Sequence, residues 1–125
     1  MNHLFIFIGC ISSGLSVALG AFAAHGLRQI ISAASLQTFE TGVRYQMYHS
    51  LALLFIGIYA NENSSKAITI AGWSFIGGLL LFSGSLYGLA LGGPRILGPI
   101  TPIGGLLWLL AWALAAIACW QKLTQ

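Results

Sequence analysis

The stretch TGVRYQMYHSLALLFIGIYA, residues 41–60, decides the fold of this chain. Its second half, residues 51–60, is apolar, but as a helix it would be only about 15 Å long. A helix needs about 20 residues to cross a membrane. The segment can therefore cross only if it carries its polar first half, with Arg44 and His49, into the membrane.

The composition supports this interpretation. Of the 125 residues, 58% are apolar and 6% are charged, whereas about a quarter of the residues in a soluble domain are charged. So few charges could not cover a water-facing surface without large apolar patches, which soluble monomers avoid. The 16 glycines lie largely in apolar stretches, as is common in membrane helices. The sequence therefore predicts an all-α membrane protein embedded in the lipid bilayer.

Four segments are long and apolar enough to be expected to cross. They are residues 4–24, 41–60, 66–91 and 102–120. The first has no charged residue and would be about 31 Å long, enough for a hydrocarbon core of roughly 30 Å. The last opens at TPIGG, where Thr101 suits an N-cap and Pro102 the first helical position. No segment alternates as membrane strands do, so we expect one domain over residues 1–125, a four-helix transmembrane bundle.

The first span has a second interpretation. Residues 21–23 read Ala-Phe-Ala, which resembles the cleavage site of a secretory signal peptide. The preceding MNH has no Lys or Arg, and the apolar stretch is longer than a signal core. We therefore expect the segment to remain as a membrane helix.

Four crossings would put both termini on one side of the membrane. The opposite side would then gather His25, Arg28, Glu40, Arg44 and Arg95, leaving Lys66 and Lys122 with the termini. The count of positive residues is nearly equal on the two sides, so the orientation stays uncertain, with the arginine side favoured for the cytoplasm. The five basic residues form no run or patch, which argues against nucleic-acid binding. Cys10 and Cys119 offer no metal-site spacing, and we expect no metal and no cofactor.

Small residues are predicted to pack the helices together, because lipid tails are as apolar as leucine and only close approach favours association. Two stripes of such residues have the spacing of one helix face: Gly9, Ser13, Ser16 and Gly20 in the first span, and Gly84, Gly88 and Gly92 in the third. These stripes exceed what one contact per helix requires. A homo-oligomer, or association with other membrane proteins, is therefore a further expectation.

The polar residues of the second span fall on two sides of a helix. Glu40, Arg44 and Tyr48 share one side, and Glu40 with Arg44 has the favourable i,i+4 order for an ion pair. Tyr45 and His49 share the other side, where His49 has no acidic neighbour. His49 could be satisfied by a serine or a carbonyl, or it could handle a ligand or a proton. The candidate polar or ligand site is His25, Arg44, Tyr45, Tyr48 and His49, with His25 alternatively capping the first helix.

Four sequence motifs resemble those of the YgdD-like family of small membrane proteins, a family of unknown function. They are GAFAAHGLR, TGVRYQMYHSLALL, LLFSGSLY and GPITPIGGLLWLLAW. The resemblance covers nearly the whole chain and implies a four-span protein of the bacterial inner membrane. It implies no reaction. Ala23 and Arg44 depart from the family's pattern, which shifts the expected site toward His25 and His49.

Three functions remain open. The favoured one is a structural or assembly protein that binds lipid or other proteins through its helix faces. The alternative is a small carrier or channel subunit with a polar path around His49. The third is a membrane enzyme acting on a lipophilic substrate through Arg44, Tyr48 and Arg95. Because the chain has only two acidic residues and no nucleophile motif, we expect no catalytic residues and favour a protein that is not an enzyme.

Overall fold

The computed structural model describes residues 2–125 and is helical almost throughout. In chain order it contains α1 (Asn2–Ala24), η1 (Leu27–Gln29), α2 (Ala33–Tyr59), α3 (Lys66–Gly78), η2 (Leu79–Ser83), α4 (Gly84–Ala90) and α5 (Leu97–Leu123). η2 is a five-residue π-helix that joins α3 to α4 without a break. The described residues therefore form four rods with no strand among them, which confirms the all-helical prediction.

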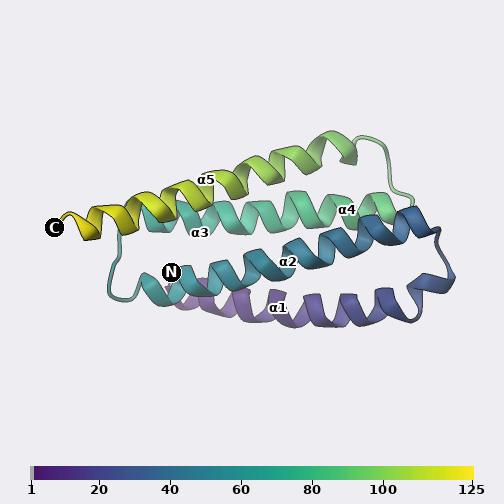
Figure 1. Cartoon of the computed structure of the whole chain (residues 1–125), viewed down its shortest axis with the longest axis horizontal. Coiled ribbons are helices and arrows are strands. Elements are labelled where there is room, and N and C mark those ends of the chain that lie inside the picture. The colour runs from purple at the N-terminus through teal and green to yellow at the C-terminus, as the bar shows by residue number, and fades with distance from the viewer. Residues whose placement is uncertain (1) are drawn as a thin grey trace.

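The four rods lie side by side in chain order and alternate in direction (Figure 1). α1 packs along α2, α5 packs along α3, and contacts of α2 with α3 and α4 join these two pairs. Both described ends of the chain lie at the same end of the molecule, and the α1–α2 and α4–α5 connections lie at the other (Figure 1). Below, these are the terminal end and the connection end.

Three of the rods are long and apolar enough to cross a membrane. They are Asn2–Gln29, Lys66–Ala90 and Leu97–Leu123. α2 has 27 residues and thus the required length, but its polar residues keep it below the hydropathy of the other three. These three rods support a membrane location.

Two helix starts differ from the prediction. α2 begins at Ala33, eight residues before the predicted 41, because Ser32 caps it: the Ser32 hydroxyl accepts a hydrogen bond from the backbone N–H of Ser35 at 3.1 Å. The prediction counted only the minimum length of a span. α5 begins at Leu97, so the prediction that Thr101 caps this helix and Pro102 opens it is wrong. Thr101 instead donates to the carbonyl of Leu97 one turn back and meets Ser85 of α4.

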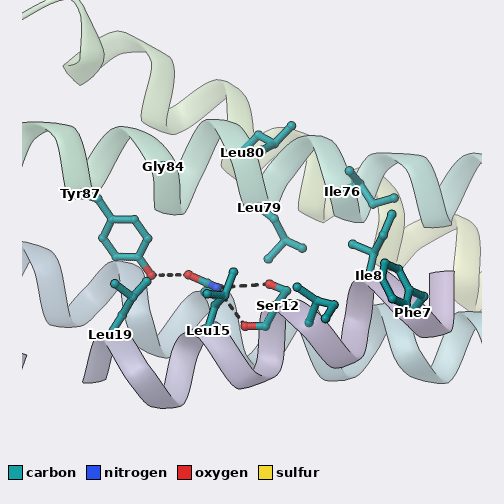
Figure 2. A pocket seen from close by; sticks show the side chains of 12 residues that line it. Phe7, Ile8, Ser12, Leu15, Leu19, Ile76, Leu79, Leu80, Gly84 and Tyr87 are labelled. Carbon is teal, nitrogen blue, oxygen red and sulfur yellow. Dashed lines mark hydrogen bonds between the residues drawn. The ribbon is translucent and has the colours of Figure 1, made fainter. Parts of the chain in front are cut away.

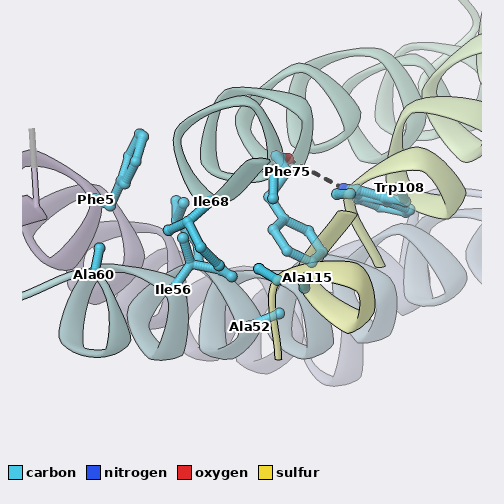
Figure 3. Close-up of a cluster of buried hydrophobic side chains, with 12 residues drawn as sticks. Phe5, Ala52, Ile56, Ala60, Ile68, Phe75, Trp108 and Ala115 are labelled. Atoms are coloured by element: carbon cyan, nitrogen blue, oxygen red, sulfur yellow. Dashed lines mark hydrogen bonds between the residues drawn. The ribbon is translucent and has the colours of Figure 1, made fainter. Parts of the chain in front are cut away.

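The buried apolar side chains form two clusters. The larger lies toward the terminal end and is drawn in Figure 3, where Phe5, Ile56, Ile68 and Phe75 come from three rods. Trp108 of α5 closes it and donates its indole N–H to the carbonyl of Phe75 at 3.1 Å. The smaller cluster lies toward the connection end and consists of Ala23, Leu27, Phe39 and Ala90. Together they fix the rods along their length.

The predicted stripe of α1 contributes to packing, because a Cβ on Gly9 would lie 3.0 Å from the Ser50 carbonyl oxygen of α2, and Ser16 is buried. A Cβ on Gly20 would lie 3.4 Å from the Val43 side chain, which is an ordinary contact distance. Ser13 leaves its hydroxyl oxygen buried without a hydrogen-bond partner.

Within this chain, one of the three positions of the stripe predicted around α4 packs closely. A Cβ on Gly88 would lie 2.5 Å from the Leu97 side chain, but one on Gly84 or Gly92 would meet no atom within 4 Å. Gly92 instead has a φ of +88° and makes the turn after α4. The closest helix approach lies elsewhere, at Gly104, where a Cβ would lie 2.4 Å from the backbone nitrogen of Phe82. α5 therefore packs directly against the widened turn of η2 as well as against α3.

Candidate functional site

Gln46 forms the centre of a hydrogen-bonded group that joins three rods. It projects from α2, and only 7% of its surface is exposed. Its side-chain N–H₂ donates to the carbonyl of Ser12 at 3.0 Å and to the Ser12 hydroxyl at 3.2 Å. Its side-chain oxygen accepts a hydrogen bond from the hydroxyl of Tyr87 of α4. One amide therefore ties α2 to both α1 and α4.

Ser50 completes this group one turn along α2. Its hydroxyl donates to the backbone carbonyl of Gln46 at 2.6 Å and lies 2.6 Å from the Ser12 hydroxyl. Every polar side-chain atom of Ser12, Gln46, Ser50 and Tyr87 thus has a partner within the group, called the Gln46 network below. In a membrane, such cross-helix hydrogen bonds contribute about 0.6 kcal/mol each on average, and up to about 2 kcal/mol.

A cavity of about 390 Å³ lies over the Gln46 network, between α1 and α3–α4 (Figure 2). Its walls are aliphatic apart from one aromatic ring. They are made by Phe7, Ile8, Ile11, Leu15 and Leu19 of α1 and by Ile76, Leu79, Leu80 and Gly84 of the facing rod. Ser12 and Tyr87 lie at its floor (Figure 2), and Gln46, hydrogen-bonded to both, lines it with them. Because Gly84 has no side chain, α4 leaves this space unfilled.

This cavity opens to the side of the molecule. Phe7, Ile11, Leu15 and Leu80 are each more than half exposed, from 52% to 70%, although they belong to its walls. Such exposure of large apolar side chains suits contact with lipid tails and not with water. We call this space the lateral groove. It is an apolar slot with a polar floor whose hydrogen bonds are already made.

His49 follows Gln46 by one turn of α2, rotated by about 60° toward α5, and is also buried, with 7% of its surface exposed. Its Nδ1 lies 2.8 Å from the carbonyl oxygen of Tyr45, and its Nε2 lies 3.2 Å from the indole nitrogen of Trp112. An indole N–H can only donate, so Nε2 accepts and Nδ1 carries the proton. The ring is therefore a neutral imidazole with both nitrogens bonded, and it stacks on Trp108 with ring centres 3.7 Å apart.

The other predicted site residues do not gather around His49. His25 is exposed just after α1, where its Nδ1 lies 2.8 Å from the Ala21 carbonyl oxygen, as expected for the capping alternative. Tyr48 is 55% exposed. Only Tyr45 lies beside His49, with the two rings nearly parallel and 6.1 Å apart.

The predicted ion pair of Glu40 with Arg44 is wrong. Across residues 2–125, the contact that Arg44 makes through its side chain is a hydrogen bond from Nη2 to the Thr41 hydroxyl at 3.1 Å. Arg44 is exposed and Glu40 is half-buried. The i−3 hydroxyl satisfies the guanidinium without bringing the two charges together.

Sequence reasoning missed the Gln46 network and the partner of His49. Gln46 was visible as a polar residue on the side of α2 opposite Arg44, but its partners Ser12 and Tyr87 lie on other helices. No spacing in one sequence identifies such partners. Within the described part of the chain, no three His, Cys, Asp or Glu side chains lie close enough to bind a metal ion.

Comparison with known proteins gives a family and relatives. Residues 19–105 match the family described as a protein of unknown function, DUF423. A UPF0382 membrane protein of Staphylococcus aureus is 44% identical over 94% of this chain and 96% of its own length. The UPF0382 membrane protein YwdK of Bacillus subtilis is 44% identical over 92% and 94%, and one of Haemophilus influenzae is 42% identical over 90% and 90%. No solved structure matches the chain.

Proposed function

This chain belongs to the DUF423 family of small integral membrane proteins, and from that premise we propose that it is a lipid-binding bundle that holds one hydrocarbon chain in the lateral groove. Its location in this proposal is the bacterial inner membrane, with both termini on one side. The observation that carries the proposal is the groove itself, which is aliphatic, laterally open and floored by polar groups that need no further partner.

The proposal includes a fourth crossing by α2. With 27 residues, α2 would be about 40 Å long, more than the roughly 30 Å of a hydrocarbon core. Its central polar residues Gln46, His49 and Ser50 are buried and hydrogen-bonded, which removes most of the cost of placing them in lipid. Arg44 lies nearer the connection end, and its long side chain can extend toward the membrane surface.

The shape of the groove favours a single chain. Along α1 the lining extends from Phe7 to Leu19, or about 18 Å at the helical rise. This length exceeds the half-thickness of a hydrocarbon core, about 15 Å. A partner helix about 10 Å across would fill roughly 1,400 Å³ over the same 18 Å, several times the 390 Å³ of the groove.

The chemistry of the groove also favours hydrocarbon. A ligand with its own polar group would have to compete with hydrogen bonds that Ser12, Gln46 and Tyr87 already make with one another. An alkyl chain needs no such exchange. It fills a space whose walls would otherwise lack contact atoms on one side, and so recovers their dispersion energy.

The carrier alternative receives less support. Both nitrogens of His49 already have partners, and the rings that pack against it belong to Tyr45, Phe75, Trp108 and Trp112. A proton path through His49 would have to break one of its two hydrogen bonds.

Native mass spectrometry tests the lipid proposal with a matched pair of variants. Gly84→Leu should fill the groove, because a Cβ there meets no atom within 4 Å. Gly14→Leu adds the same side chain at an exposed position of α1 that is not part of the groove lining, where a Cβ also meets nothing. After stepwise delipidation, the wild type and Gly14→Leu should keep one phospholipid that Gly84→Leu has lost. If the two folded variants retain the phospholipid equally, the result contradicts the proposal.

A further inference from the structure

A second cavity, of about 520 Å³, lies between α2 and α5, on the His49 side of α2. It is separate from the lateral groove: α5 and the Phe82 side of η2 form its walls, and no residue is shared between the two linings. α2 thus presents Gln46 to one cavity and His49 to the other. We call the second space the aromatic groove.

The walls of the aromatic groove are mostly rings. Tyr45, His49, Phe82, Trp108 and Trp112 all line it, in contrast to the aliphatic lateral groove. Aromatic walls offer a hydrocarbon chain no contact that the aliphatic walls of the lateral groove do not also offer. A planar ring gains more, because offset and edge-on ring pairs attract beyond the effect of burial. The walls therefore select a ring-bearing molecule from the surrounding lipid.

The aromatic groove has no formal charge to offer. Its lining contains no Lys, Arg, Asp or Glu, and its histidine is neutral as judged from its hydrogen bonds. An ion would enter without a counter-charge, which is costly in a membrane. The electrostatic match is therefore to an uncharged molecule.

His49 supplies one hydrogen-bond acceptor at this wall. The Tyr45 carbonyl fixes the proton on Nδ1 and so leaves Nε2 as an acceptor. Its present donor is Trp112, at 3.2 Å, the long end of the normal range. Trp112 itself lines the cavity and is 47% exposed, so its side chain has room to turn aside and release Nε2.

We propose that the aromatic groove binds an uncharged lipophilic molecule in which a planar ring carries a hydroxyl group. The ring lies against Tyr45 and Phe82, and the hydroxyl donates to Nε2 of His49 in place of the Trp112 indole. This site is independent of the acyl-chain site proposed above, because it uses a different cavity.

The test uses two probes that differ only in the hydroxyl. They are a bromophenol with a nonyl chain and the bromobenzene with the same chain, added to the protein in lipid nanodiscs. Bromine quenches nearby indoles, so in a background where the exposed Trp73 and Trp120 are replaced by phenylalanine, saturable loss of tryptophan fluorescence reports binding in the aromatic groove. In the wild type the two probes should differ little, because the hydroxyl only replaces the Trp112 indole as the donor to Nε2. In Trp112→Phe the bromophenol should half-saturate at a concentration about fivefold to tenfold lower than the bromobenzene, the worth of one hydrogen bond. Equal affinity of Trp112→Phe for the two probes would overturn the proposal.

Two variants identify the acceptor. Added to Trp112→Phe, His49→Ala should abolish the preference for the hydroxyl, and a preference that survives in the folded double variant contradicts the assignment. Trp112→Phe keeps a ring but removes the competing donor, so it should bind the bromophenol about fivefold more tightly than the wild type. Unchanged or weaker binding by Trp112→Phe overturns the proposal even where His49→Ala fails to fold. Gly84→Leu should leave both probe affinities unchanged, which separates this site from the lipid site.

Discussion

Trp112 of α5 donates its indole N–H to Nε2 of His49 on α2 across 3.2 Å. The two rods also meet where His49 stacks on Trp108, although α5 packs chiefly on α3 and η2. The hydrogen bond therefore joins the second and last rods directly. It also fixes His49 as the neutral tautomer with its proton on Nδ1.

Loss of this hydrogen bond should have a measurable cost. Trp112→Phe should lower the free energy of unfolding by about 1 kcal/mol, because Nε2 loses its donor while most of the ring contact remains. The measurement is equilibrium unfolding in mixed micelles of dodecyl maltoside and SDS. Trp120→Phe is the control, since Trp120 is 64% exposed and should change stability little. An equal loss in both variants would mean that ring size and not the hydrogen bond matters.

The Gln46 network should respond to removal of a single hydroxyl. Tyr87→Phe takes away the donor to the Gln46 side-chain oxygen and should cost between about 0.6 and 2 kcal/mol in the same unfolding measurement. Tyr48→Phe removes the hydroxyl of a tyrosine that is 55% exposed, and we expect no change. If the two substitutions prove equivalent, the network does not contribute to stability.

The contact of α5 with the π-helix predicts a sharp difference between adjacent glycines. Gly104→Ala would place its methyl group 2.4 Å from the backbone nitrogen of Phe82, and since backbone cannot rotate aside, the rods must separate. We expect a loss of about 1–3 kcal/mol in stability. Gly105→Ala places its methyl 3.7 Å from the Phe82 ring, an ordinary contact, and should be tolerated. Comparable stability of the two variants would contradict this packing.

Glu40 and Arg44 should behave as independent residues. Because Arg44 bonds to Thr41 and makes no ion pair with Glu40, a double-mutant cycle of Glu40→Gln and Arg44→Gln should give a coupling energy below about 0.3 kcal/mol. The cycle is measured by unfolding at low salt, where an exposed pair would be strongest. Coupling of about 0.5 kcal/mol or more would restore the predicted pair.

The four-crossing proposal predicts which positions share a side of the membrane. In a background where Cys10 and Cys119 are replaced by serine, single cysteines at Gln29 and Arg95 should react with an impermeant maleimide from one side of sealed vesicles. Cysteines at Glu62 and Gln125 should react only from the other side. Reaction of positions 29 and 62 from the same side would mean that α2 does not cross.

Much of the helical architecture could be read from the sequence, because apolar length is a local property. The spans predicted at residues 4–24 and 66–91 lie within a residue or two of α1 and of the α3–α4 rod. The start of α5 was misplaced because proline is common at the first helical position, and Pro102 was placed there. In the structure Pro102 lies inside the helix, a position that local rules disfavour.

The candidate site could be predicted only in part, for a different reason. The 3.6-residue period of a helix predicted which residues share a side of α2, and it correctly placed Arg44 and His49 on different sides. The partners of His49 and Gln46 lie 63 and 34 to 41 positions away in the chain. Which side chain of one helix meets which side chain of another depends on the rotation of both helices about their axes and on their relative height, and neither can be read from one sequence.

The π-helix η2 determines how the residues of α4 are rotated about the axis of the third rod. A residue added to or removed from a helix turns the remainder by about 100°. Tyr87 reaches Gln46, and Ser85 reaches Thr101, only downstream of this widened turn. Removal of one residue from Leu79–Ser83 would point both side chains elsewhere while leaving the rod apolar and long enough for a bilayer. The five-residue π-helix thus determines which side chains of α4 face α2 and which face α5.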